Sequence, residues 1–286
     1  MAAGFLMTPP SGMSYSDWSP AEAVREAKVA GYDFVKVYQP DRETYFCLLR
    51  AAAEHGISAE GHVPYEVGVD EAADSGLAII EHMTSSVLAA CVSDPPDDPQ
   101  SPTKSPRRAA FEQKMNVFTF PLRITPECRR HATTLARNRT ANVPTLSTLS
   151  PTSSDPRIKD MQAAEAAALK ILDSAGVVVL AGTDYIVRHR RPGESLHEEL
   201  EMLAAALSPL KALQAATVNA ATVTGVPAVG SIAEGGPASM ILLAGDPLID
   251  IRNTRRIDGV IQRGRYYDRV ARNRLIQGTG AAARSP

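Results

Sequence analysis

The chain has 286 residues, of which 44% are hydrophobic and 22% charged, a composition that allows a globular protein with a buried core. Its formal net charge of -2 lacks the basic excess that nucleic acids and membrane surfaces attract, so we expect neither as a partner. The three cysteines are scattered and form no C-x-x-C pair. They therefore predict no disulfide framework and a reducing, cytoplasmic location.

The expected elements alternate between short apolar strands and Ala-rich helices. Residues 1–13 read as the end of a strand followed by a loop, and a helix is expected from Pro20 with Ser19 as its cap. Residues 93–110 are rich in proline and charge, which indicates a mobile surface loop beside the site. Further strands are expected near 33–38, 57–62, 78–82, 140–146 and 177–182.

The last part of the chain changes character. Two helices are expected to begin near Ser195 and Ser208, and from about Gly230 the pattern predicts short strands joined by glycine turns. This β-rich stretch is too small to fold alone, so it must pack against another part of a protein.

Four of the strands follow a glycine that suits the left-handed position just past a helix end. Each of these strands is apolar on both faces, as in a parallel sheet covered by helices on both sides. Each also leads to a polar residue at its C-terminal end, where a (β/α) barrel carries its chemistry. These residues are Lys36, His62, His82 and Asp184.

Lys36 lies among apolar residues in the sequence FVKVY. Burial of an ammonium group there is costly and favours the neutral amine, which can react with carbon dioxide to give a carbamate that binds metal. The alternative is a lysine that reaches solvent from the strand end or pairs with a carboxylate. The sequence around Lys36 leaves both interpretations open.

His62 and His82 end consecutive strands, and imidazole is a common zinc ligand. A single histidine at such a place is more often a hydrogen-bonded structural residue. Asp184 either caps the following loop or binds metal and accepts a proton from water. His197 lies in a helical setting that does not match H-E-x-x-H, and we expect a surface or supporting role for it.

Several segments together resemble one family. The segments VKVY, EGHVP, IEHM, VPTL, AGTD, LHEEL, SPLKALQAATVNAA and the closing GSI…LLAGDPLIDIRNTRRIDGVIQRGRYYD occur in the order found in the amidohydrolase superfamily. The resemblance is to its imidazolonepropionase-like and Xaa-Pro dipeptidase branch, and it covers nearly the whole chain.

This resemblance implies an α/β fold with an incomplete (β/α)8 TIM-type barrel, comprising strands three to eight, and a small C-terminal β-sandwich portion. The partial barrel would span residues 1–228, the sandwich portion 229–270, and a disordered tail 271–286. By resemblance, Lys36 is a carboxylated bridging ligand, His62 and His82 bind one metal, and Asp184 binds the other and carries the proton. The implied cofactor is a divalent metal, zinc by expectation.

The implied reaction is hydrolysis of a C–N bond in an amide, cyclic amide or Xaa-Pro dipeptide by metal-activated hydroxide. One departure bears on it: the family's H-x-H pair, which holds the second metal, occurs nowhere in this sequence. We therefore expect a truncated member with one or two ions and an incomplete second site. The alternative is a catalytically impaired remnant. A small molecule or dipeptide is the expected substrate, and the chain is a candidate homo-oligomer.

Overall fold

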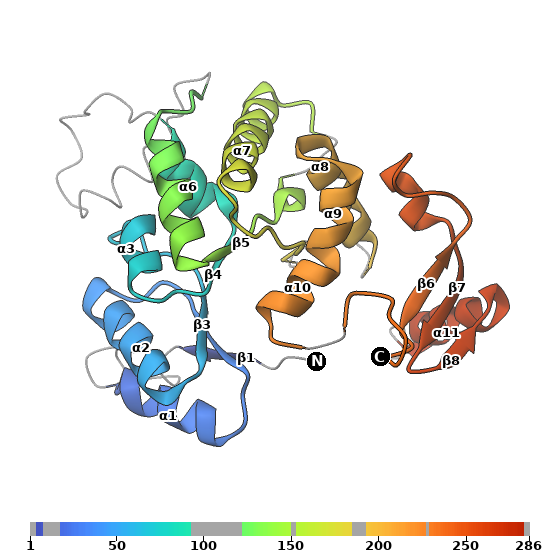
Figure 1. The fold of residues 1–286 in the computed structure, drawn as a ribbon, viewed down its shortest axis with the longest axis horizontal. Coiled ribbons are helices and arrows are strands. Elements are labelled where there is room, and N and C mark those ends of the chain that lie inside the picture. The colour runs from blue at the N-terminus through green and yellow to red at the C-terminus, as the bar shows by residue number, and fades with distance from the viewer. Residues whose placement is uncertain are drawn as a thin grey trace.

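The computed structural model describes residues 4–7, 18–92, 122–149, 153–184, 193–226 and 229–282. The loop expected at 93–110 and most of the segment 185–195 lie outside these residues. Within the described part, a parallel sheet and its helices form one layered body, and a second, antiparallel sheet lies at the other end of the molecule (Figure 1).

The larger sheet has five parallel strands in the order β1-β2-β3-β4-β5. The segment expected as a further strand at 177–182 joins this sheet through a single parallel bridge between Val179 and Asn142. The expectation of a partial (β/α) barrel is confirmed. The strands are β1 (Gly4–Met7), β2 (Phe34–Val37), β3 (Ser58–Gly61), β4 (Ile79–Glu81) and β5 (Ala141–Val143).

The helix boundaries follow local chemistry. Ser19 accepts a hydrogen bond from the amide of Glu22 at 3.4 Å, and Pro20 opens α1 as expected. Gly56, with φ of 60°, ends α2 in the left-handed conformation. The helices are α1 (Pro20–Val29), α2 (Arg42–His55), α3 (Val69–Asp74), α4 (Ala89–Cys91), α6 (Glu127–Asn138), α7 (Pro156–Ser174), α8 (Glu194–Ala206), α9 (Pro209–Ala216) and α10 (Val218–Val223).

The two faces of the parallel sheet differ in polarity. Val35, Val37 and Ile80 are buried in the main core, between the sheet and its outer helices. Residues paired in parallel register share a face, and the opposite, inner row runs through Leu6, Lys36, Glu60, Ile79 and Ala141. Charged side chains therefore stand on the inner face at β2 and β3, where a barrel keeps its site.

The antiparallel sheet, in the order β6-β7-β8, follows at the C-terminal end. Its strands are β6 (Met240–Leu243), β7 (Ile257–Gln262) and β8 (Arg265–Tyr267), with a 3-10 turn at Ile251–Arg255 before β7. Helices α8 to α10 lie between the two sheets (Figure 1). The turn contacts α8 directly, because His197 Nδ1 lies 2.9 Å from Thr254 Oγ1 and Arg255 donates to Glu201 at 2.8 Å.

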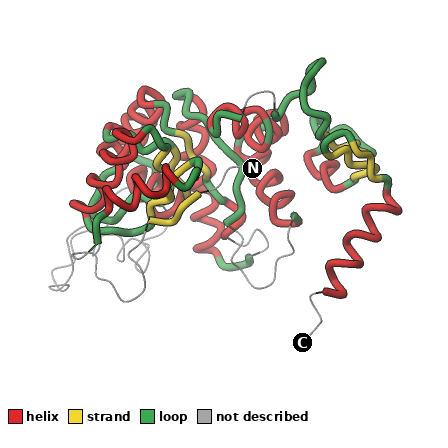
Figure 2. Tube along the Cα trace, turned by 90° about the horizontal axis from the view of Figure 1, so that it is seen from below, coloured by secondary structure: helices red, strands yellow, loops and turns green. Residues whose placement is uncertain are grey.

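The described residues that follow Asp268 are helical, whereas the sequence predicted a disordered tail over 271–286. They form α11 (Arg269–Ala282), which extends away from the body (Figure 2). Asp268 Oδ1 accepts from the amide of Ala271 at 2.7 Å, and Arg272 donates to the carbonyl of Ile257 at 2.6 Å. The side chain of Asp268 at the start of the helix and the contact of Arg272 with β7 both stabilise the helical form of this segment.

The cysteines also differ from expectation. Cys91 and Cys128 form a disulfide between α4 and α6, with their Cα atoms 4.3 Å apart, and Cys47 is free. The expectation of unpaired cysteines is wrong for this pair, because the fold brings together residues 37 positions apart.

Among the described residues, no helix is both long and apolar enough to cross a bilayer.

Candidate functional site

The structure brings the four predicted residues together at the C-terminal ends of the parallel strands. Lys36 Nζ lies 2.5 Å from Glu81 Oε2, and the rings of His62 and His82 have centroids 4.7 Å apart. His82 Nε2 lies 3.6 Å from Asp184 Oδ2. This location is where the chemistry of a (β/α) barrel is expected.

Lys36 forms an ion pair with a carboxylate, which is one of the two alternatives left open by its sequence. Its side chain is 33% exposed and that of Glu81 is 19% exposed. The pair spans β3, because Lys36 lies in β2 and Glu81 ends β4. The ammonium thereby neutralises a carboxylate at the centre of the site.

His62 is held by a close approach of two backbones. Gly61 has φ of 129°, and a Cβ atom there would overlap the carbonyl oxygen of Val37. That same oxygen accepts from the amide of His62 at 2.9 Å. The imidazole packs against Tyr38 and His82, each with ring centroids 4.7 Å away. Burial, and then the charges of His82 and Lys36, lower the pKa of His62 to about 4, so its ring is neutral at pH 7.

His82 breaks the alternation of its strand. In an extended strand Glu81 and His82 would point to opposite faces. His82 instead has φ of 61°, an uncommon value for a residue other than glycine, and its ring lies beside His62 on the site side. Its Nδ1 lies 2.8 Å from Thr145 Oγ1, which leaves Nε2 facing Asp184. Backbone strain of this kind, costing about 1–3 kcal/mol, is typical of functional positions.

Asp184 lies beside His82 without a hydrogen bond to it, because 3.6 Å is too long for one. Its side chain is 33% exposed and its φ is 38°. The carboxylate therefore faces the site with an accepting oxygen accessible to solvent.

Two acidic residues were missed in the sequence. Glu81 immediately precedes His82 in IEHM, and Glu60 shares the inner face with Lys36. Burial, and then the charge of Glu81, raise the pKa of Glu60 from 4.5 to about 7. Strand alternation could have identified Glu60, whereas the placement of Glu81 beside His82 depends on a backbone angle that the sequence does not reveal.

The donor set fits a divalent metal. His62, Glu81 and His82 each offer a ligand atom within 4.8 Å of the others. Metal-binding histidines commonly donate a hydrogen bond from the second ring nitrogen, and the contact between His82 Nδ1 and Thr145 Oγ1 is such a bond in the tautomer that carries its proton on Nδ1. Two imidazoles and a carboxylate form a ligand set found in zinc hydrolases.

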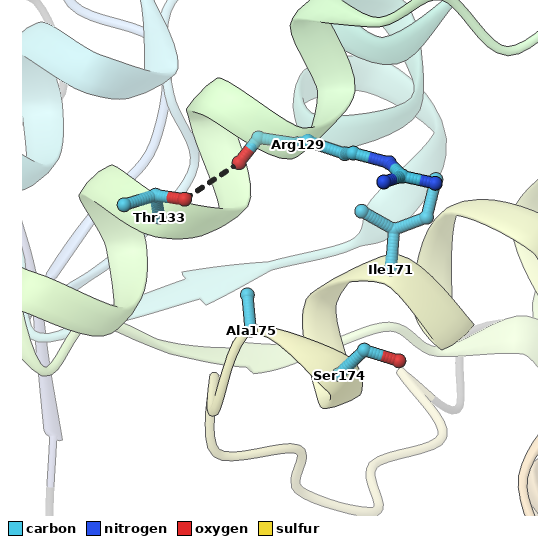
Figure 3. A pocket seen from close by; sticks show the side chains of 5 residues that line it. All are labelled: Arg129, Thr133, Ile171, Ser174 and Ala175. Atoms are coloured by element: carbon cyan, nitrogen blue, oxygen red, sulfur yellow. Dashed lines mark hydrogen bonds between the residues drawn. The ribbon is translucent and has the colours of Figure 1, made fainter.

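The other histidines have separate roles. His131 Nδ1 lies 2.9 Å from Asp70 Oδ1 on the outer helices, and His197 contacts Thr254 as described above, consistent with the supporting role expected for it. A hollow of about 330 Å³ lies between α6 and α7 and includes none of the site residues (Figure 3). It is lined by Arg129, Thr133, Ile171, Ser174 and Ala175.

A parallel sheet wrapped by helices, with imidazoles and carboxylates at its C-terminal edge, defines a barrel protein with a candidate metal centre. The chain belongs to the amidohydrolase family, whose model matches residues 28–266. No curated protein matches the sequence.

Solved structures share the fold at low sequence identity. A Xaa-Pro dipeptidase with bound methionine is 20% identical, with a TM-score of 0.60, over 93% of this chain and 66% of that one. Ochratoxinase from A. niger is 20% identical, with a TM-score of 0.60, over 93% and 59%. Bottromycin amidohydrolase is 22% identical, with a TM-score of 0.61, over 99% and 67%. The chain thus spans between 59% and 67% of the length of these structures.

Proposed function

We propose that this chain is a metal-dependent hydrolase of C–N bonds. The observation that carries the proposal is the convergence of His62, His82 and Glu81 on one point, with Asp184 beside it. Membership of the amidohydrolase family supports the hydrolase class. Its structural neighbours include a Xaa-Pro dipeptidase and a bottromycin amidohydrolase, which supports an amide or dipeptide as the substrate.

Zinc is the divalent metal that this set favours, and when bound it would act as a Lewis acid. His62 presents a neutral ring because its pKa lies near 4, and His82 is oriented by Thr145. We assign to Asp184 the role of accepting and returning a proton, because its carboxylate is half-exposed and not hydrogen-bonded to His82.

We further propose that Lys36 becomes carboxylated when the metal is present. The free ammonium pairs with Glu81, so a carbamate at this position would face that carboxylate with the same charge. A divalent cation among Glu81, His62 and His82 would offset this repulsion. Carboxylation and metal binding should therefore occur together.

One observation favours the alternative of a metal-free, non-catalytic chain. The ion pair between Lys36 and Glu81 balances the charge of the site without a cation. On this alternative the chain keeps the fold and binds no metal tightly.

Metal titration of the purified chain decides between these proposals. After removal of metal with a chelator, Zn²⁺ binding is measured by calorimetry and elemental analysis for the wild type, His62→Ala and His82→Ala. We expect about one Zn²⁺ per wild-type chain and loss of binding in both variants. His131→Ala is the matched control, because His131 is similarly buried but pairs with Asp70 away from the site.

The metal-loaded chain is then tested on Xaa-Pro dipeptides and N-acylated amino acids, with Asp184→Asn for comparison. The proposal predicts hydrolysis that Asp184→Asn reduces by about 100-fold or more while Zn²⁺ is retained. Absence of Zn²⁺ binding in the wild type, or equal binding in His82→Ala, would support the metal-free alternative.

A further inference from the structure

A buried carboxylate lies behind the candidate metal centre, and we propose that Glu199 is a positioning residue for His82. The inference rests on the proposed metal site. Glu199 does not approach the ligand atoms. It holds the turn that carries Thr145, and Thr145 in turn orients the imidazole of His82.

Both carboxylate oxygens of Glu199 accept hydrogen bonds from this turn. Its Oε1 accepts from the amide of Leu146 at 3.1 Å, and its Oε2 accepts from the amide of Ser147 at 2.7 Å. Its side chain is fully buried on α8. Burial of a carboxylate costs free energy unless hydrogen bonds compensate for the lost water. The two amides of the turn provide such bonds, and the bonds in turn hold the turn in place.

Three contacts join the turn to His82 and the neighbouring Met83. The amide of His82 donates to the carbonyl of Val143 at 2.9 Å, and the amide of Met83 donates to that of Pro144 at 3.1 Å. The third contact is the side-chain hydrogen bond between His82 Nδ1 and Thr145 Oγ1 at 2.8 Å. Because Thr145 itself has φ of 50°, a small rotation of the turn would move its hydroxyl away from the ring.

The contact with Thr145 bears on which ring nitrogen can bind a cation. With the proton on Nδ1 and Thr145 accepting it, Nε2 keeps its lone pair toward Asp184. Loss of the turn would allow either nitrogen to carry the proton. Groups that orient a ligating histidine in this manner typically change metal affinity by about 10–100-fold when they are removed.

Helix α8 is itself anchored on a second face. His197 contacts Thr254, and Glu201 accepts from Arg255, both in the turn before β7. Glu199 lies on the buried face of the same helix. The position of its carboxylate is therefore set by rigid packing on both sides of α8 rather than by a loop.

The test uses the full chain labelled with ¹⁵N-histidine and free of metal. Long-range ¹H–¹⁵N spectra at pH 7.5 report which nitrogen of His82 carries the proton, with assignment from His82→Ala. We expect the Nδ1–H form in the wild type and in Thr145→Ser, which keeps the hydroxyl. We expect a mixture of forms in Thr145→Val and Glu199→Gln. Glu201→Gln is the control for a carboxylate on the same helix that does not touch the turn, because Glu201 pairs with Arg255, and it should behave as the wild type.

Zn²⁺ affinity is measured on the same proteins. Glu199→Gln and Thr145→Val should weaken it by about 10–100-fold, and Thr145→Ser by less than about threefold. If Glu199→Gln does not fold, Glu199→Asp replaces it, since its shorter side chain keeps the charge but cannot reach both amides.

The two proposals fail separately. A wild type that binds no Zn²⁺ would overturn the proposed function, while the His82 spectra would still decide the role of Glu199. Wild-type spectra and Zn²⁺ affinity in a folded Glu199 variant would overturn the positioning role.

Discussion

Lys36 Nζ lies 2.5 Å from Glu81 Oε2, across the strand β3 that separates the two residues. The lysine was identified in the sequence as a candidate metal ligand, and its partner was not. The pair places a positive charge where a metal site needs ligands. On the proposed function, the charge on Lys36 therefore affects how tightly a cation binds there.

This relationship predicts that bicarbonate and metal bind cooperatively. Addition of bicarbonate should strengthen Zn²⁺ binding to the wild type, because a carbamate on Lys36 removes the ammonium and adds a ligand. Lys36→Gln should show no bicarbonate effect. Calorimetry with and without bicarbonate measures this, and ¹³C NMR with labelled bicarbonate detects the carbamate. Equal Zn²⁺ affinity under both conditions would leave Lys36 as an ion-pair partner only.

Gly61→Ala should destabilise the fold and disturb His62. An added Cβ atom would overlap the carbonyl oxygen of Val37, and the alanine backbone would have to keep a strained positive φ. Together these effects should cost more than about 3 kcal/mol. Gly76→Ala is the matched control, because Gly76 also has positive φ but no atom within 4 Å of the added Cβ. Its cost should be about 1–2 kcal/mol. Urea unfolding compares the two, and equal losses would disprove the close approach.

Stability should fall with rising pH because of Glu165. Burial raises the pKa of this carboxyl from 4.5 to about 7, and Thr84 donates to it at 2.5 Å. Between these values the native state holds a proton that the unfolded state has released, so the free energy of unfolding decreases as pH rises from 4.5 to 7. The decrease is about 3 kcal/mol at most.

Glu165→Gln should remove this part of the pH dependence. Urea unfolding gives the change in the free energy of unfolding between pH 5 and pH 7.5 for the variant and for the wild type. The difference between these two changes reports Glu165 alone, because the similar contribution of Glu60 is present in both proteins. An unchanged pH slope in the variant would contradict the assignment.

The disulfide predicts a defined thiol count. Denatured, unreduced protein should show one free thiol, that of Cys47, and Cys47→Ser should show none. Reduction should lower the free energy of unfolding by about 4 kcal/mol, because the bond links residues 37 positions apart. Three reactive thiols in the oxidised wild type would show that Cys91 and Cys128 remain unpaired.

Much of the secondary structure and the region of the candidate site could be predicted from local features of the sequence. Caps and glycines act over a few residues, so the start of α1 at Pro20 and the end of α2 at Gly56 follow from local chemistry. Parallel strands share one C-terminal edge, so Lys36, His62, His82 and Asp184 could be assigned to one region from their places alone. A family resemblance carried by ordered motifs strengthened the same assignment.

The contacts that each of these residues makes could not be predicted from the sequence, because they depend on how distant segments pack. The pairing of Lys36 with Glu81 spans three strands. The placement of the His82 ring on the site side depends on a positive φ and on a contact with Thr145, 63 residues further along the chain. The bond between Cys91 and Cys128 and the grip of Glu199 on Leu146 and Ser147 are likewise long-range. Such contacts form because packing brings distant segments together, and no local pattern in the chain encodes them.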